Sequence, residues 1–266
     1  MQKDVHFYLT YAMCKLMGIE NAELIAWANQ RTDEVTWARL YEIQTQSGVF
    51  GNWFDKQIQL SVLIAFHFIP GDDQENPWMT TECCSKAQTL LTEVIASGNP
   101  FKIGIALHSF QDTFSHQGFS GWDEKLNSCF PWYRMFRQST PNIGHTELGI
   151  IPDVVDYSWT DPRNDKEIVN RERVSRCISA MCEMFRDENY SKDMRAVFSV
   201  FLNTKSYDKR KETLRRIIGS PVKYSELNKK HKGVHREQFS QAATKQLSVM
   251  MNLVADLPRK ETEEDG

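Results

Sequence analysis

The sequence predicts an all-α protein, because helical spacing of apolar residues recurs along the chain and the alternation typical of strands is nowhere sustained. Of the 266 residues, 41% are hydrophobic and 25% are charged, which are the values of a globular protein and exclude a fibrous or disordered one. Turn signals such as Gly98-Asn99-Pro100 separate the apolar segments. We therefore expect a single helical domain over residues 1–258, followed by an acidic flexible tail over residues 259–266.

The predicted elements follow from this periodicity in chain order. A first helix over residues 6–17 ends at Gly18, and a helix over residues 101–116 is apolar on most faces, so we expect it to be central and buried. The remaining predicted helices cover residues 22–30, 52–68, 84–97, 165–186, 192–203, 208–218 and 234–257. Residues 118–162 contain four glycines and four prolines and are expected to form a long irregular segment, which is often functional in a compact domain.

Composition excludes several classes of protein. The formal net charge of −3 argues against a polyanion binder by bulk charge, although residues 205–236 carry eleven Lys/Arg against three Asp/Glu. Nucleic acid is therefore a conceivable partner, but a solvated helical face is the more common explanation of such a stretch. The longest apolar run, residues 62–70, is shorter than the roughly 18 residues that cross a bilayer. The chain opens without the apolar core of a secretory signal, so we expect a cytoplasmic protein with reduced cysteines and, by default, a monomer.

The sharpest local pattern is His108-x-x-x-Asp112-x-x-x-His116 in the central helix. Steps of four residues place the three side chains on one stripe of a helix, with the two histidines about 12 Å apart along its axis. A metal–nitrogen bond is only about 2 Å long, so one ion does not easily take both histidines. Asp112 could instead bridge two ions, one beside each histidine. The alternative is polar decoration of a helix, which the apolar neighbours make less attractive because buried His and Asp need partners.

Four further segments combine histidine with carboxylates or lie at the ends of predicted helices. Each has an ordinary alternative: a helix cap, a turn, or a core histidine with a satisfied hydrogen bond. Together with the central helix they supply neutral imidazoles and carboxylates without thiolates, which is the composition of a hydrolytic zinc site. The candidate ligands in these segments are Asp4, His6, Asp33, His67, His145, Glu147 and Asp153.

The order of these residues resembles the zinc-dependent phospholipase C and single-strand nuclease superfamily. The match is closest at Phe66-His67-Phe68 and from Leu107-His108 through His116, and it extends in order over roughly residues 6–153. The resemblance is to a bacterial branch of that superfamily rather than to its characterised enzymes. It implies an all-α fold of the zinc phospholipase C type and three zinc ions.

Carried over by residue, the resemblance implies three sets of metal ligands. Asp33, His67, His108 and Asp112 would hold one ion, His6 and the bridging Asp112 a second, and His116 with His145 and either Glu147 or Asp153 a third. The characterised enzymes use the amino group of an N-terminal tryptophan, whereas Met1 here precedes a bulky Gln2 and should be retained, so we expect Asp4 to replace that amine as a ligand. The spacing from Asp112 to His116 is shorter than usual in the superfamily, so a two-metal enzyme is the alternative.

These ligands predict a metal-dependent hydrolase, most simply a phosphoesterase or phosphodiesterase. Metal ions bridged by a carboxylate can hold a hydroxide near neutral pH, and that hydroxide attacks phosphorus in line. Asp112 would bridge the ions, and Asp33 would also orient the nucleophile. The substrate would be a small-molecule, lipid or nucleotide phosphoester.

Aromatic residues after the central helix could stack a base or receive an acyl chain, or they could equally form a small core under the irregular segment. They are Phe119, Trp122, Phe130, Trp132, Tyr133 and Phe136. Two other functions remain open from the sequence: an iron or manganese helical hydrolase or oxygenase, and a non-catalytic interaction module that metal stabilises.

Overall fold

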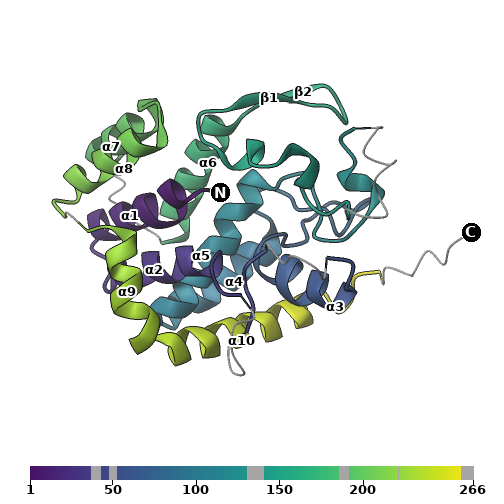
Figure 1. Cartoon of the computed structure of the whole chain (residues 1–266), viewed down its shortest axis with the longest axis horizontal. Coiled ribbons are helices and arrows are strands. Elements are labelled where there is room, and N and C mark those ends of the chain that lie inside the picture. The colour runs from purple at the N-terminus through teal and green to yellow at the C-terminus, as the bar shows by residue number, and fades with distance from the viewer. Residues whose placement is uncertain (37–42, 48–52, 131–140, 186–191, 221, 259–266) are drawn as a thin grey trace, which may run out of the picture.

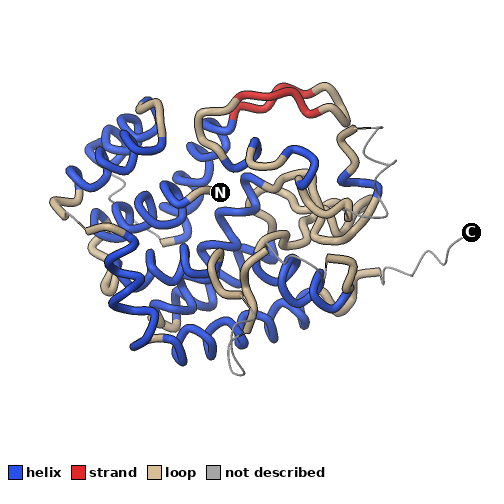
Figure 2. Tube along the Cα trace, in the orientation of Figure 1, coloured by secondary structure: helices blue, strands red, loops and turns tan. Residues whose placement is uncertain are grey.

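The computed structural model describes residues 1–36, 43–47, 53–130, 141–185, 192–220 and 222–258 (Figure 1). Over these residues the chain is mostly helical, with one two-stranded antiparallel sheet (Figure 2). The predicted helical class is therefore confirmed. The predicted tail over residues 259–266 lies outside the described residues. No helix among those described is both long and apolar enough to cross a membrane.

The centre of the fold is α5 (Pro100–Ser115), whose residues are buried along almost its whole length. Asn99 begins the helix by accepting hydrogen bonds from the backbone N–H groups of Phe101 and Lys102, as an N-cap does. On one side α5 packs closely against α2 (Ala22–Thr32), where a side chain at Gly104 would clash with the backbone oxygen of Ile25. This close approach brings the end of α2 beside the polar stripe of α5.

The other helices surround this pair and bury one large apolar cluster that includes residues from Met1 to Val254. The N-terminal helix has a π-helical first part, η1 (Asp4–Leu9), followed by α1 (Thr10–Leu16). The other helical elements are α3 (Lys56–Ile58), π-helical η2 (Gln59–Ile64), α4 (Ser85–Ala96), α6 (Asn170–Met184), α7 (Lys192–Asn203), α8 (Tyr207–Ile217), α9 (Tyr224–Val234) and α10 (Arg236–Leu253).

The region between α5 and the two-stranded sheet is irregular over its described part, as predicted for most of residues 118–162. It contains three short 3₁₀ turns, η3 (Lys125–Asn127), η5 (Thr146–Leu148) and η6 (Ile151–Asp153). A second, smaller apolar cluster, which includes Phe68 and Phe119, lies beneath this region.

The structure differs from the prediction in two places. The helix expected over residues 165–186 begins only at Asn170, because the preceding residues form a hairpin of β1 (Ser158–Asp161) and β2 (Lys166–Val169). A turn around Asp165, whose φ is +57°, connects these short strands. The helix expected over residues 234–257 begins at Arg236, and α9 precedes it without having been predicted. Only three residues of α9 are buried, so the helix has a narrow apolar stripe and is otherwise polar. The helical spacing of apolar residues is therefore too weak to be recognised in the sequence.

Candidate metal centre

The polar stripe of α5 forms part of a cluster of histidines and carboxylates. His108 and Asp112 are almost fully buried, and His116 directly follows the helix. Two π-helical segments supply further histidines, since His6 lies within η1 and His67 follows shortly after η2. π-Helical turns are often found at functional sites, and here each of them is close to one histidine of the cluster.

The most compact set, which we call the inner group, consists of His67, His108 and Asp112. Asp112 Oδ2 lies 3.1 Å from His67 Nδ1 and 3.2 Å from His108 Nε2, and the two histidine nitrogens are 3.1 Å apart. The side chains of this group are at most 2% exposed. Three donor atoms therefore face one another in a space that water scarcely reaches.

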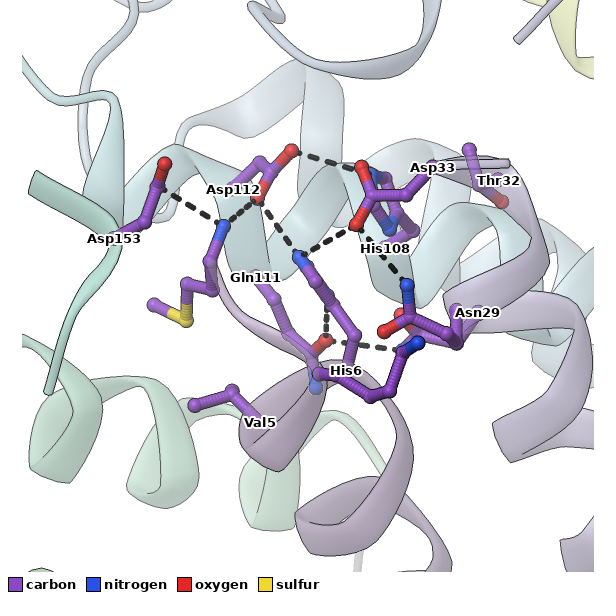
Figure 3. Close-up of polar contacts among 12 residues, drawn as sticks. Val5, His6, Asn29, Thr32, Asp33, His108, Gln111, Asp112 and Asp153 are labelled. Carbon is purple, nitrogen blue, oxygen red and sulfur yellow. Dashed lines mark hydrogen bonds and ion pairs between the residues drawn. The ribbon is translucent and has the colours of Figure 1, made fainter. Parts of the chain in front are cut away.

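A second set, the Asp33 group, consists of His6, Asp33 and His108. Asp33 directly follows α2, and its oxygens lie 3.5 Å from His108 Nε2 and 4.0 Å from His6 Nε2. His6 Nε2 also lies 3.3 Å from Asp112 Oδ1, the oxygen that does not face the inner group. Figure 3 shows Asp112 between Asp33 on one side and Asp153 on the other.

The two oxygens of Asp112 thus face different donors, which is the geometry of a bridging carboxylate. The helix spacing predicted a bridge between ions beside His108 and His116, and this is only half right. On the second side Asp112 faces His6, which comes from the N-terminal helix. His116 uses Nδ1 to donate to the backbone oxygen of His67 at 2.7 Å and turns Nε2 away towards Asp153.

The third set, the Asp153 group, consists of His116, His145 and Asp153. Asp153 Oδ1 lies 3.4 Å from His116 Nε2, and Oδ2 lies 3.6 Å from His145 Nε2. The other carboxylate considered for this position, Glu147, accepts hydrogen bonds from the backbone N–H groups of Cys129 and Phe130. The structure therefore brings Asp153, and not Glu147, to these two histidines.

Asp4 does not join any of the three groups, contrary to the prediction. Its side chain is fully buried and pairs with the equally buried Arg210 at 2.7 Å. The α-amino group of Met1 occupies the place predicted for Asp4, lying 2.6 Å from Asp112 Oδ1 and 3.2 Å from Asp153 Oδ1. Arg210 also donates to Asp156 at 2.7 Å, so one guanidinium holds the segment before His6 and the segment after Asp153.

Hydrogen bonds fix which nitrogen of each histidine faces the cluster. His67 Nε2 lies 2.7 Å from the backbone oxygen of Thr45, and His145 Nδ1 lies 2.8 Å from that of Gly149. A carbonyl oxygen only accepts, so these nitrogens carry the proton, as does Nδ1 of His116. The other nitrogen of each ring then presents a lone pair to the carboxylates.

His6 follows the same rule through a side chain. Its Nδ1 lies 2.9 Å from Gln111 Oε1, and Gln111 Nε2 donates to Thr10 Oγ1 at 2.8 Å, which turns the amide oxygen towards the ring. Asn29 donates to the same amide oxygen at 2.9 Å. His6 Nε2 is left buried, without a hydrogen bond among the described residues, and directed at Asp112 and Asp33.

The charge states favour a cation in the cluster. Burial opposes ionisation of Asp112, but the Met1 ammonium and the neighbouring histidines outweigh it and hold the pKa of the carboxyl well below its usual range. The pKa of Asp153 is lowered in the same way, against burial, by the ammonium and by His145 and His116. Burial, together with the nearby His6, lowers the pKa of His108 to about 4. A neutral His108 beside an ionised Asp112 is a donor set that a metal ion can use, since the imidazole then need not lose a charge to bind it.

The donor spacing fits zinc. Bonds of about 2.0–2.1 Å in a tetrahedral arrangement separate neighbouring donor atoms by roughly 3.3 Å. The contacts within the inner group are 3.1–3.2 Å, and those to Asp153 are 3.4 and 3.6 Å. All donors in the three groups are nitrogen or oxygen, and none of these groups contains a cysteine.

Three of the six aromatic residues after α5 that could contact a substrate lie within the described residues, and all three belong to the apolar clusters. Phe119 is fully buried in the smaller apolar cluster, against which Phe130 packs, and Trp122 is 7% exposed in the large cluster. These three therefore form core and do not offer an open stacking surface. Trp132, Tyr133 and Phe136 lie outside the described residues.

Sequence reasoning missed three parts of this arrangement. The amine of Met1, the clamp of Arg210 and the orienting amide of Gln111 are all non-local, with partners 100 or more residues away in the chain. The signals available were buried polar residues in helices that otherwise read as apolar, namely Gln111 beside Asp112 and Asn29 in α2.

Comparison with known proteins bears on the whole chain. A model described as a family of unknown function (DUF6765) matches residues 1–263, which include every residue of the three groups. The chain belongs to the DUF6765 family. No curated protein and no solved structure matches it. For this DUF6765 chain, the resemblance to the zinc phospholipase C and nuclease superfamily therefore rests on the residues themselves.

Proposed function

We propose that this chain is a zinc-dependent phosphoesterase with a multinuclear centre and a fold of the zinc phospholipase C type. The observation that carries the proposal is the orientation of the histidines. Four of the five rings have their outward nitrogen bound to a fixed acceptor, so that the remaining nitrogens converge on Asp112 and Asp153. Such orienting hydrogen bonds accompany metal-binding histidines, and here they leave the unprotonated nitrogens of several rings gathered around two carboxylates.

The donors divide naturally among three ions. His108 Nε2 has one lone pair and can serve only one ion, which we assign to the inner group together with Asp33. The second ion would take His6, Asp112 Oδ1 and, in a chain whose N-terminus is free, the amine of Met1. The third would take the Asp153 group. In the two-ion alternative, the Asp153 group would be the one left without metal.

The residues of the chain would have distinct roles. When bound, zinc ions ionise water near neutral pH and stabilise negative charge on phosphoryl oxygens. Asp112 is buried between two donor sets and would fix the distance between them. Asp33 has a side chain that is 31% exposed, compared with 2% for Asp112, so it lies at the open edge of the centre and would orient the attacking water. Asp153, at 19% exposure, lies on the same open edge, on the other side of Asp112 (Figure 3).

The substrate class follows from the chemistry of this centre. Clustered divalent cations favour a substrate with several anionic oxygens on one atom, which is the property of a phosphoester. We propose a phosphodiester or phosphomonoester of a small molecule, a lipid or a nucleotide.

The proposal is tested by hydrolysis of two chromogenic esters, bis(p-nitrophenyl) phosphate and p-nitrophenyl phosphate. We expect turnover of at least one of them, loss of turnover after 1,10-phenanthroline treatment, and recovery on adding zinc. Recovery with iron or manganese but not zinc would favour the alternative helical metalloenzyme. Absence of turnover in a protein that retains metal would contradict the phosphoesterase proposal and favour a non-catalytic metal-stabilised module.

A further inference from the structure

A cavity of about 470 Å³ lies apart from the metal centre, between the β1–β2 hairpin, the start of α6, the turn at Gln117-Gly118 and the segment 79–81. The β1–β2 hairpin leads directly into α6 and lies at the edge of the fold (Figure 1). None of the ten predicted site residues lines it. Its volume suits a small molecule rather than a single water or ion.

Three arginines line the cavity, and two of them are already paired. Arg163 binds Asp161 through Nε and Nη2 at 2.9 and 2.6 Å, and Arg176 binds Glu82 through Nε and Nη2 at 2.6 and 2.8 Å. Arg173 forms no ion pair with any carboxylate of the described residues. Its hydrogen bond goes from Nη1 to the backbone oxygen of Ser115 at 3.0 Å.

Arg173 is also the most deeply buried of the three, at 5% exposure. An unpaired guanidinium in such a place is costly, because burial removes hydration that a single carbonyl oxygen replaces only in part. Burial is the main reason that the pKa of Arg173 falls to about 10, with Glu82 and Asp161 opposing the change. The ring of Trp159 lies 5.8 Å from the guanidinium, near the outer limit of a cation–π contact. The local charge therefore lacks a close counter-ion.

A second unsatisfied group lies in the same wall. Thr80 is fully buried and lines the cavity, and its Oγ1 has no hydrogen-bond partner among the described residues. A buried hydroxyl of this kind usually has a partner. The exposed acids Glu167 and Glu172 also line the cavity, and they disfavour a ligand with several negative charges.

We infer that this cavity binds a small molecule through one oxyanion group, a phosphate or a carboxylate, held by Arg173 and Thr80. The planar guanidinium group of arginine pairs equally well with a phosphate and with a carboxylate. We therefore assign an oxyanion group, which both have in common. The inference does not rest on the metal centre, whose ligands lie outside the cavity.

The test is calorimetric titration of the full chain, in slightly acidic buffer where inorganic phosphate is mostly a monoanion, with inorganic phosphate and, separately, with acetate. We expect saturable binding of at least one anion, unchanged after removal of metal with the neutral chelator 1,10-phenanthroline. Arg173→Met should weaken binding by about ten- to a hundredfold, which is what loss of a charge-assisted hydrogen bond to a buried group costs. The matched control is Arg176→Met, one helical turn further on, whose guanidinium is already paired with Glu82; it should weaken binding less.

Thr80→Val provides a second test that keeps the side-chain volume and should fold even if Arg173→Met does not. It should weaken binding of the same anion severalfold. The inference is overturned if neither anion binds saturably, if both variants bind as tightly as the wild type, or if binding disappears with the metal while Arg173→Met leaves it unchanged. A response to phosphate but not acetate identifies the oxyanion as a phosphate, and the reverse identifies a carboxylate.

Discussion

The inner group and the Asp153 group use the same kinds of side chain but are built differently. The inner group comes from α5 and the segment after η2, its side chains are at most 2% exposed, and its donor contacts are 3.1–3.2 Å. The Asp153 group combines the residue after α5 with two residues of the irregular region, and its side chains are 6%, 14% and 19% exposed. The first group lies where the segment after η2 packs against α5, with His67 also bound to the backbone oxygen of Thr45. Two of the three residues of the second group, by contrast, depend on how the irregular region is held.

This difference predicts unequal metal affinity. Donors that packing has fixed lose little freedom on binding an ion, and they act in a drier environment where each contact is stronger. Donors on a more exposed loop must be ordered by hydrogen bonds such as that from His145 to the backbone oxygen of Gly149. We therefore expect the inner group to retain metal longest and the Asp153 group to exchange it most readily.

The largest effect is expected from Asp112→Asn, which removes the bridging charge of the inner group. Turnover of a phosphodiester should fall by about a thousandfold or more, because several kcal/mol of charge stabilisation are lost. The bound metal should fall by at least one ion per chain, measured by elemental analysis. Asp55→Asn, which alters an N-cap at the start of α3, is the matched control and should keep both metal and turnover. Unchanged metal content in Asp112→Asn would remove this residue from the centre.

Arg210→Met tests the buried ion pair that connects the segment before His6 with the segment after Asp153. It should lower the free energy of unfolding by about 3–5 kcal/mol, because Asp4 would be left buried without its partner. Chemical denaturation of the metal-free protein measures this. The double variant Asp4→Asn with Arg210→Met should recover part of the loss, since no uncompensated charge then remains. Equal stability of the single and double variants would contradict this explanation, since neutralising Asp4 would then relieve no buried charge.

Asp153→Asn should affect only the more exposed group. We expect zinc affinity at one site to fall by about ten- to a hundredfold while the remaining ions stay bound, because a ligand or its support typically contributes that much. Glu147→Gln is the matched control, since this carboxylate binds the backbone N–H groups of Cys129 and Phe130 and not a histidine. Loss of zinc in Glu147→Gln but not in Asp153→Asn would reverse the assignment.

A smaller effect is expected from Gln111→Leu, which frees the His6 ring without removing it. Metal affinity at the second ion should fall by about tenfold, as for other residues that orient a metal ligand. Gln246→Leu is the control, because its buried amide binds Ala65 and Ser109 and touches no histidine. Both variants should lose similar stability in urea, and only Gln111→Leu should bind metal more weakly. A similar loss of zinc in both would indicate general loosening of the core.

The sequence was informative where structure is local. Fixed helix geometry made His108 and Asp112 predictable as one stripe, and apolar flanks showed that this stripe is buried. The sequence could not distinguish Glu147 from Asp153, because a loop places residues through contacts such as those of Asn170 with the backbone oxygens of Ile151 and Val154. The choice between two nearby carboxylates was therefore made by tertiary structure.

The exchange of Asp4 for the Met1 amine has the same cause. Proximity to His6 in the sequence suggested a shared site, but in η1 the Asp4 side chain turns to Arg210, more than 200 residues away. The packing of helices that are distant in the sequence determines which group pairs with a buried charge. A local sequence pattern therefore cannot predict that partner. The two π-helical segments were likewise hidden, since their residues look like those of ordinary α-helices.

The most direct test of the central claim is the zinc content of the wild-type chain after exhaustive dialysis against metal-free buffer, with the intact mass confirming a free N-terminus at Met1. We expect two to three zinc ions per chain. If there are three, a mild chelator should remove one of them first, equally readily from the wild type and from Glu147→Gln, and this should be the ion that Asp153→Asn binds more weakly. A chain that carries no metal, and that added zinc neither binds nor stabilises against heat, would contradict the account.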